Sequence, residues 1–244
     1  MVKAIIYRFK TGTQWRELPL RQFFSFSIKS YKTVFYHYNK WAKDGSWQRL
    51  WTALLKANKA ALDMSSVALD GSQTRARMGG EAVGYQSRKS AKTTNMLFLT
   101  DRNGIPLGMS KPVSGNHHDL YEINKSFKNI CEILEQADID PRGLVMNADA
   151  GFDSKDFREY CDGLDILANI DINKRNAKNT DYEYFVDPEL YKERFAVERT
   201  NAWIDGFKSL LVRYETSARN WMNAHFIAFS IILLRKNKVA TNHF

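Results

Sequence analysis

Cysteine is scarce in this chain, with 2 residues in 244. Cys131 and Cys161 each lie in a segment of helical pattern, which is typical of reduced thiols in a cytoplasmic protein. Two isolated thiols cannot form a zinc site by themselves. A chain of this length buries roughly 70% of its unfolded surface, so it needs no disulfide or structural metal to fold.

Long hydrophobic runs are also missing. The N-terminus has too short an apolar segment, and no small-residue cleavage site, for a signal peptide. The most apolar stretch, Ala224 to Leu234, is too short to span a bilayer and contains His225 and Ser230. We therefore expect no membrane partner. The segment from Ala4 to Tyr7 is apolar without a preceding helix cap, which predicts that an N-terminal portion is missing.

Acidic residues are outnumbered. The 27 Asp and Glu stand against 36 Lys and Arg, so the net charge is +9 and the isoelectric point about 9.4. Such an excess is most easily explained by a polyanionic partner, of which nucleic acid is the first candidate. A solvated basic surface without a partner is the alternative.

The hydrophobic pattern predicts two parts. Residues 1–62 form a small helical N-terminal segment with helices at Ser27 to Ala42 and Trp47 to Leu62, and lysines on these helices offer a contact to DNA. Residues 63–238 form a second part with alternating strands and helices. Its expected elements are strands at 66–70, 93–100, 105–113, 143–148 and 165–170, and helices at 119–137, 154–161, from 187 onward and at 220–236. This order is that of an α/β, ribonuclease-H-like mixed sheet flanked by helices.

Helix caps support these boundaries. Asp119 and Glu122 form a capping-box pattern for the helix that runs to about 137. Ser154 is placed to cap the next helix, and Asp187 to cap a long helix with Pro188 at its first position.

Three acids are delivered by regular elements. Asp70 ends the first expected strand, Asp149 follows the fourth, and Glu198 lies inside the long helix. For Asp70 alone, a strand that stops at an Asp-Gly turn is the simpler alternative. The first and fourth strands are neighbours in a ribonuclease-H-like sheet, so all three side chains can converge. Two carboxylates about 4 Å apart repel by about 4 kcal/mol at an effective dielectric near 20, so they must share a proton or a cation.

Carboxylates without an adjacent Cys or His favour Mg²⁺ or Mn²⁺ over zinc. A pair of such ions activates a water or a 3′-hydroxyl for displacement at phosphorus. On the long helix, Tyr191, Arg194, Glu198 and Asp205 share one stripe beside an apolar stripe of Leu190, Val197, Ile204 and Leu211. A solvated Arg194/Glu198 ion pair is the alternative explanation of that spacing.

These acids stand in three motifs: Leu69-Asp70-Gly71-Ser72, Asp149-Ala150-Gly151-Phe152 and Tyr191-x-x-Arg194-x-x-x-Glu198. Residues 104–107, 116–119, 197–200 and 213–215 extend the pattern, and residues 12–19 and 44–47 extend it into the N-terminal segment. The combination resembles the DDE transposases of bacterial insertion sequences, in the insertion-sequence-five-like group. The resemblance covers nearly the whole chain.

The resemblance implies that Asp70, Asp149 and Glu198 are the metal-binding catalytic acids, and that Tyr191 and Arg194 orient DNA or Glu198. It also implies assembly as a homodimer on DNA. Related transposases often have a basic residue seven positions after the glutamate, where this chain has Asp205, and Lys208 is the candidate to replace it. The loop residues Lys174 and Arg175 are candidate phosphate contacts, with a plain solvated loop as the alternative.

We therefore hypothesise a DNA transposase that cleaves a strand and joins the freed 3′-hydroxyl to target DNA. Another nuclease of the same fold would cut without joining. An inactive or truncated remnant would bind DNA without metal-dependent chemistry.

Overall fold

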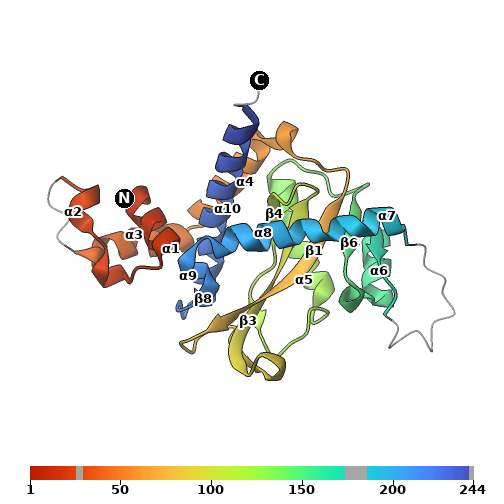
Figure 1. Cartoon of the computed structure of the whole chain (residues 1–244), viewed down its shortest axis with the longest axis horizontal. Helices are drawn as coiled ribbons and strands as arrows, with labels where there is room; N and C mark the ends of the chain where they lie inside the picture. The colour runs from red at the N-terminus through yellow and green to blue at the C-terminus, as the bar shows by residue number, and fades with distance from the viewer. Residues whose placement is uncertain (26–29, 174–185, 242–244) are drawn as a thin grey trace.

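The computed structural model of the chain describes residues 1–25, 30–173 and 186–241. Its centre is a mixed sheet, which within those residues has eight strands (Figure 1). The strands are β1 (Val67–Ala76), β2 (Gly84–Gln86), β3 (Ala91–Asp101), β4 (Pro106–Met109), β5 (Val113–Ser114), β6 (Val145–Ala148), β7 (Leu167–Ile170) and β8 (Val212–Arg213).

The sheet is ordered β2-β3-β1-β6-β7, with β4 and β5 also paired to β3 and β8 paired to β1. β1 runs antiparallel to β3, whereas β1 and β6, and β6 and β7, are parallel. The predicted first and fourth strands are thus neighbours. This confirms the predicted α/β class, because the mixed sheet with its flanking helices is compatible with a ribonuclease-H-like fold.

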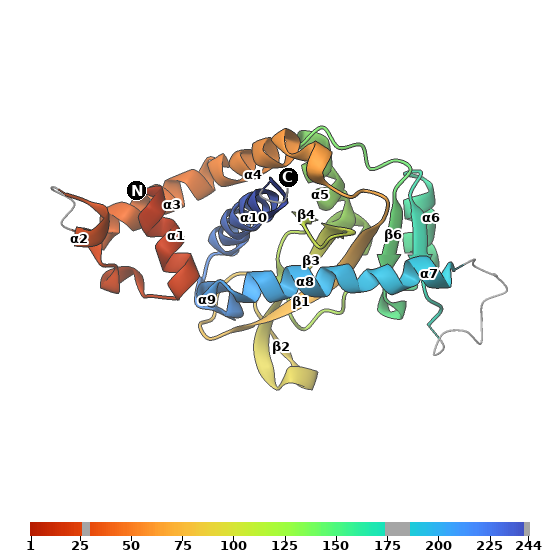
Figure 2. The same cartoon turned by 45° about the horizontal axis from the view of Figure 1, so that its top comes forward.

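Helices lie on both sides of this sheet and beyond one end of it. They are α1 (Val2–Thr11), α2 (Leu20–Phe23), α3 (Tyr31–Lys43), α4 (Ser46–Ala57), α5 (Ile123–Gln136), α6 (Lys155–Asp162), α7 (Pro188–Tyr191), α8 (Ala196–Asp205), α9 (Lys208–Leu211) and α10 (Ala218–Thr241). Figures 1 and 2 both show α8 crossing the sheet over β1, with α1 to α3 at one end of the molecule. No helix in the described ranges is both long enough and apolar enough to cross a membrane.

Strand pairing decides which helix covers which face. Side chains of antiparallel partners point to the same side of a sheet. Asp70 is paired with Phe98, whose ring packs on Phe229 of α10. The opposite face is covered by α5, whose Ile130 approaches Gly108 of β4. Asp70 therefore points to the face that carries α8 and α10.

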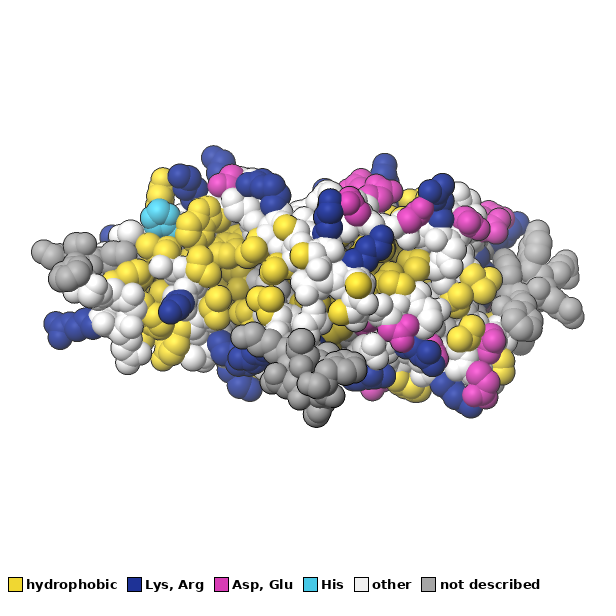
Figure 3. Space-filling view, turned by 90° about the horizontal axis from the view of Figure 1, so that it is seen from above, with side chains coloured by type: hydrophobic (Ala, Val, Ile, Leu, Met, Phe, Trp, Pro, Cys, Tyr) yellow, Lys and Arg dark blue, Asp and Glu magenta, His cyan; other side chains and the backbone are white. Residues whose placement is uncertain are grey.

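The N-terminal helices pack on the last part of the chain. The Tyr38 hydroxyl of α3 donates to the Asn220 carbonyl, and Arg8 of α1 donates to the Ser209 hydroxyl. Arg8 also lies 3.9 Å from the Glu215 carboxylate. In Figure 3, the visible Asp and Glu side chains lie mainly over the half of the molecule with β6 and α6, whereas Lys, Arg and hydrophobic side chains dominate over the N-terminal helices.

The predicted end of the first strand at Asp70 is wrong. β1 continues to Ala76 because its antiparallel pairing with β3 runs unbroken from Val67 to Arg75. What stops beside Asp70 is the pairing with β6, which ends at Leu69. Gly71 does not break the strand. A Cβ at this position would lie 2.2 Å from Oδ1 of Asp119, so the glycine makes room for that carboxylate.

The predicted capping box at Asp119 and Glu122 is also wrong, because the Asp119 carboxylate binds a partner on the sheet. Oδ1 of Asp119 accepts a hydrogen bond from the buried Asn95 side chain, at 2.6 Å, instead of capping a helix. α5 begins only at Ile123, and Glu122 before it has a φ of 47° and makes no side-chain cap. The Ser154 and Asp187 caps are confirmed: Ser154 accepts from the Phe157 N–H, and Asp187 from those of residues 189 and 190.

The other helix boundaries shift by a few residues. α3 begins at Tyr31 behind a Ser30 cap, and residues 26–29 of the predicted helix lie outside the described ranges. α4 ends at Ala57, before a short 3₁₀ turn at Lys59–Ala61. α10 is longer than predicted at both ends.

Candidate active site

Asp70 is held in the middle of β1, where β6 stops pairing. The residue is half-buried, and its Oδ1 accepts a hydrogen bond from the Gly71 N–H at 2.7 Å. β1 is paired on both sides up to Leu69, on one side from Asp70 to Thr74, and on both sides again at Arg75, so the carboxylate lies where one side of β1 opens.

Asp149 follows β6 directly. It caps the short 3₁₀ helix η4 (Ala150–Phe152), since its Oδ1 accepts from the Gly151 N–H at 2.7 Å. A Cβ on Gly151 would lie only 2.8 Å from this oxygen, so the glycine permits the tight turn. Asp149 itself is exposed.

Glu198 comes from the helix that crosses the sheet. α7, the 3₁₀ stretch η6 (Lys192–Phe195) and α8 follow one another without interruption from the Asp187 cap. The predicted apolar stripe holds for Val197 and Ile204, which are buried, and this fixes the rotation of α8. Glu198 lies one residue beyond Val197 and is exposed.

The three acids meet around one cavity of about 190 Å³. Asp70 comes from β1, Asp149 from the turn after β6 and Glu198 from α8, so acids that are far apart in sequence share one space. The cavity is lined by Leu69, Asp70, Asp149, Arg194, Phe195, Val197 and Glu198.

The electrostatics of this cavity act mainly on Asp70. Burial, helped by the nearby charges of Asp149, Asp119 and Glu198, raises the pKa of its carboxyl to about 7, against the opposing effect of the Gly71 N–H. The site therefore holds negative charge that is only partly compensated by the protein. A cation would relieve both the desolvation and the repulsion.

We predict from this raised pKa that the metal-free protein loses stability as the pH rises. Between pH 4 and 7 the folded carboxyl of Asp70 keeps a proton that the unfolded chain has released, so the free energy of unfolding falls across this window. The loss should reach about 2 to 4 kcal/mol above pH 7. It is measured by urea unfolding at pH 5 and pH 8 in EDTA.

Asp70→Asn should lack this component, and the difference between the two proteins isolates it from other titrating groups. Excess divalent cation should also recover stability at pH 8 in the wild type. An identical pH dependence in both proteins would contradict the assignment.

The donor atoms at this cavity are of the type that binds a divalent cation, although the three carboxylates do not converge on one position. Within the described residues, no three Cys, His, Asp or Glu side chains lie close enough together to hold an ion. The cavity offers carboxylate oxygens from three elements, and oxygen donors suit hard divalent cations.

Arg194 contacts aromatic rings, not Glu198. Its guanidinium carbon lies 4.4 Å from the ring centre of Tyr191 and 3.9 Å from that of Phe195. Throughout the described part of the chain, no ion pair joins Arg194 to Glu198, so the alternative of a solvated ion pair does not hold. Burial raises the pKa of Tyr191, an effect that Arg194 opposes and that nearby acids strengthen.

Lys208 lies away from the three acids. α8 ends at Asp205, and Lys208 starts α9, where its Cβ lies close to the glycine that ends α1. It is exposed and lies near Lys10, whose pKa is lowered by burial and by Arg235 and Lys208. The helix break also leaves Leu211 exposed, so the predicted apolar stripe does not extend that far. Lys174 and Arg175 lie outside the described residues.

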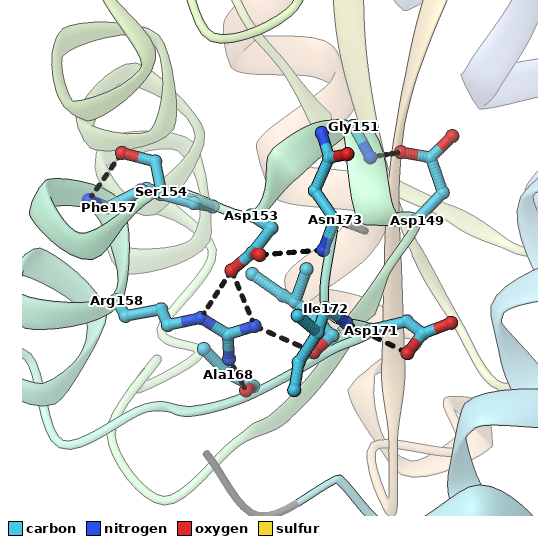
Figure 4. A network of polar contacts seen from close by, with 11 residues as sticks. Asp149, Gly151, Asp153, Ser154, Phe157, Arg158, Ala168, Asp171, Ile172 and Asn173 are labelled. Atoms are coloured by element: carbon cyan, nitrogen blue, oxygen red, sulfur yellow. Dashed lines mark hydrogen bonds and ion pairs between the residues drawn. The ribbon is translucent and has the colours of Figure 1, made fainter. Parts of the chain in front are cut away.

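Two features near the site were not predicted. The first is Phe195, which is 48% exposed at the cavity wall. The only sequence signal for it is its position three residues before Glu198. Figure 4 shows the other, a polar network behind Asp149. There Arg158 of α6 contacts the Asp153 carboxylate at 2.9 Å and donates to the carbonyls of Ala168 and Ile170.

Comparison with known families gives two matches. The family described as "Transposase DDE domain" matches residues 39–233, a range that contains all three acids. The family described as "Putative transposase of IS4/5 family" matches residues 1–51. A comparison with curated proteins gives no significant match.

Proposed function

This chain belongs to the DDE transposases of the IS4/IS5 type, and we propose that it cleaves and joins DNA at the cavity between Asp70, Asp149 and Glu198. The observation that carries the proposal is the shared cavity. Three carboxylates from a strand, a turn and a helix line it together, and burial raises the pKa of one of them to about 7. Such crowding of acids costs stability, so it points to chemistry rather than to folding.

Asp70, Asp149 and Glu198 would hold the divalent cation that this family generally uses, and we propose Mg²⁺ or Mn²⁺. When bound, such ions activate the attacking oxygen and stabilise the leaving oxygen at phosphorus. The three acids would supply carboxylate oxygens as ligands, each held by a regular element of the fold. Arg194 at the cavity wall adds a positive charge for a non-bridging phosphate oxygen, while the Phe195 ring limits access of water from that side.

The proposed reaction uses only water and the phosphodiester bonds of DNA, with no nucleotide co-substrate. In the first step the oxygen of a water bonds to phosphorus, the bond to the 3′ oxygen breaks, and a free 3′-hydroxyl results. In the second step that hydroxyl bonds to a phosphorus of the target and displaces another 3′ oxygen. Each joining step therefore conserves the number of phosphodiester bonds.

Further contacts to DNA are proposed outside the cavity. Tyr191 and Arg194 would orient the strand beside Glu198, and Lys208 would contact a phosphate farther along the α8 direction. Lys174 and Arg175 remain candidate phosphate contacts. We propose residues 1–62 as a DNA-contacting segment, residues 63–238 as the catalytic domain, and a homodimer as the form that acts on DNA.

The proposal predicts metal-dependent nicking of supercoiled plasmid. Wild type should nick in Mg²⁺ or Mn²⁺ and not in EDTA, and Glu198→Ala should lose nicking by at least about 10²-fold because one cation ligand is gone. Glu198 is exposed, so the variant should unfold at the wild-type temperature. Both proteins are purified side by side. Nicking that persists in Glu198→Ala would refute the three-acid site, and DNA binding without nicking by either protein would favour an inactive remnant.

A further inference from the structure

Residues 75–92 form a projection that we call the basic arm. It contains the end of β1, all of β2 and the start of β3. Figures 1 and 2 show it extending beyond the body of the molecule, away from α4 and α10. Its cations are Arg75, Arg77, Arg88, Lys89 and Lys92, and its single acid is Glu81.

The cations of the arm are not neutralised by the protein. Within the described residues, none of the five makes an ion pair. Glu81 is directed elsewhere, because its carboxylate accepts from the N–H of Ala218 at the start of α10. The pKa of Lys89 is lowered by burial and then by the charges of Arg88 and Arg75, against a smaller opposing effect of Asp119. The arm therefore gathers positive charges that repel one another.

The arm is nevertheless rigidly built. Arg213 is 1% exposed, and its guanidinium donates to the carbonyls of Glu81 and Ala82 at the base of the arm. The backbone there is also paired, since the Arg77 N–H donates to the Arg213 carbonyl and the Glu81 N–H to that of Thr216. Nearer the tip, Lys89 donates to the Gln73 carbonyl at 2.8 Å.

A glycine permits the closest contact at this base. Gly80 has a φ of 140°, and a Cβ there would lie 2.4 Å from the Thr216 carbonyl oxygen. A buried arginine and a glycine are thus both used to hold a charged projection in place. A merely solvated basic loop would need neither.

One strand, β1, runs from the catalytic cavity into the arm. Asp70 and Arg75 both lie on β1, and five residues of extended strand span roughly 17 Å. Successive phosphates of one DNA strand are spaced about 3.4 Å apart along the helix axis, so this length corresponds to roughly five base pairs. A duplex with one phosphate at the cavity can therefore reach the arm.

We propose that the basic arm binds the phosphate backbone of the duplex being cleaved, on the order of five base pairs from the phosphate at the cavity. The inference rests on the proposed function in taking DNA as the substrate. Phosphate contacts position a duplex without reading its sequence. The arm would thus fix the direction in which DNA leaves the cavity, whatever the sequence of the element ends.

The test uses a variant with three exposed arm cations removed, Arg77→Gln/Arg88→Gln/Lys92→Gln. Arg75 and Lys89 are kept because they donate to backbone carbonyls, those of Lys89 and Gln73 respectively, and so help to hold the arm. The matched control is Lys125→Gln/Lys128→Gln/Arg142→Gln, which removes the same charge from α5 and the loop after it. Binding of a labelled 30-base-pair duplex is followed by fluorescence anisotropy in EDTA, at several NaCl concentrations.

The slope of log affinity against log salt should become shallower by about three in the arm variant, and by less than one in the control. An arm variant with the wild-type slope would overturn the proposal, as would an equal change in the control. If the triple variant is not folded by circular dichroism, Arg88→Gln alone should change the slope by about one. The assay needs no cleavage, so a failure of the nicking experiment leaves its result readable.

Discussion

Asp149→Asn is expected to abolish strand cleavage while leaving the fold intact. The amide keeps an oxygen that can accept the Gly151 N–H, so the turn after β6 should form as before. Asp149 is exposed, and the substitution creates no buried unpaired group. What is lost is the negative charge that would bind a cation beside Asp70. We expect at least about a 10³-fold loss of nicking, or about 4 kcal/mol in the barrier.

The measurement compares initial rates of plasmid nicking in Mn²⁺ for wild type, Asp149→Asn and a matched control. Asp171→Asn is that control, because Oδ1 of Asp171 also accepts a hydrogen bond from a following backbone N–H, at 2.8 Å, and the residue is exposed but does not line the cavity. The control should keep wild-type activity. Equal activity in Asp149→Asn would remove Asp149 from the site, and equal loss in both variants would point to a general charge effect.

The sequence was most informative where local pattern and strand order act together. The apolar run before Asp149 and the Asp187 cap predicted a strand end and a helix start, and both are present. From these, the order of elements predicts that Asp70, Asp149 and Glu198 lie near one another, and all three line one cavity. Such predictions succeed because strand ends, helix starts and helix phase are set by residues close in sequence.

Contacts between distant residues could not be predicted this way. Asp119 resembles a helix cap, yet Asn95 and Gly71 provide a better place for its carboxylate, and neither residue is near it in sequence. The same holds for β1, for which the sequence predicts an end at Asp70 because Asp-Gly resembles a turn. Pairing with β3 overrides that local preference.

Helix phase also fails once the helix ends. Lys208 is the candidate to replace the basic residue seven positions after Glu198, but α8 ends at Asp205 and Lys208 begins a separate helix, α9. Buried arginines were not predicted at all, since no pattern distinguishes Arg158 or Arg213 from surface residues. Their role is defined only by the carbonyls that they bind.

The second large effect is expected for the buried ion pair behind Asp149. The side chains of Arg158 and Asp153 are only 7% and 13% exposed, and Oδ2 of Asp153 also accepts from the Asn173 N–H. This network joins the segment after η4 to the end of β7 (Figure 4). Removing the arginine leaves a buried carboxylate and two carbonyls without their donor.

Arg158→Met should therefore lower the free energy of unfolding by about 3 to 5 kcal/mol, measured by urea unfolding at pH 7. Arg142→Met, which breaks the exposed pair with Asp140, is the control and should change stability little. The double variant Arg158→Met/Asp153→Leu should be more stable than Arg158→Met alone, because it no longer buries an unpaired charge. A double variant as unstable as the sum of its parts would show that the arginine acts through packing. Nicking should fall in Arg158→Met even where the protein is folded, since Asp149 lies four residues before Asp153 on the segment that this network holds.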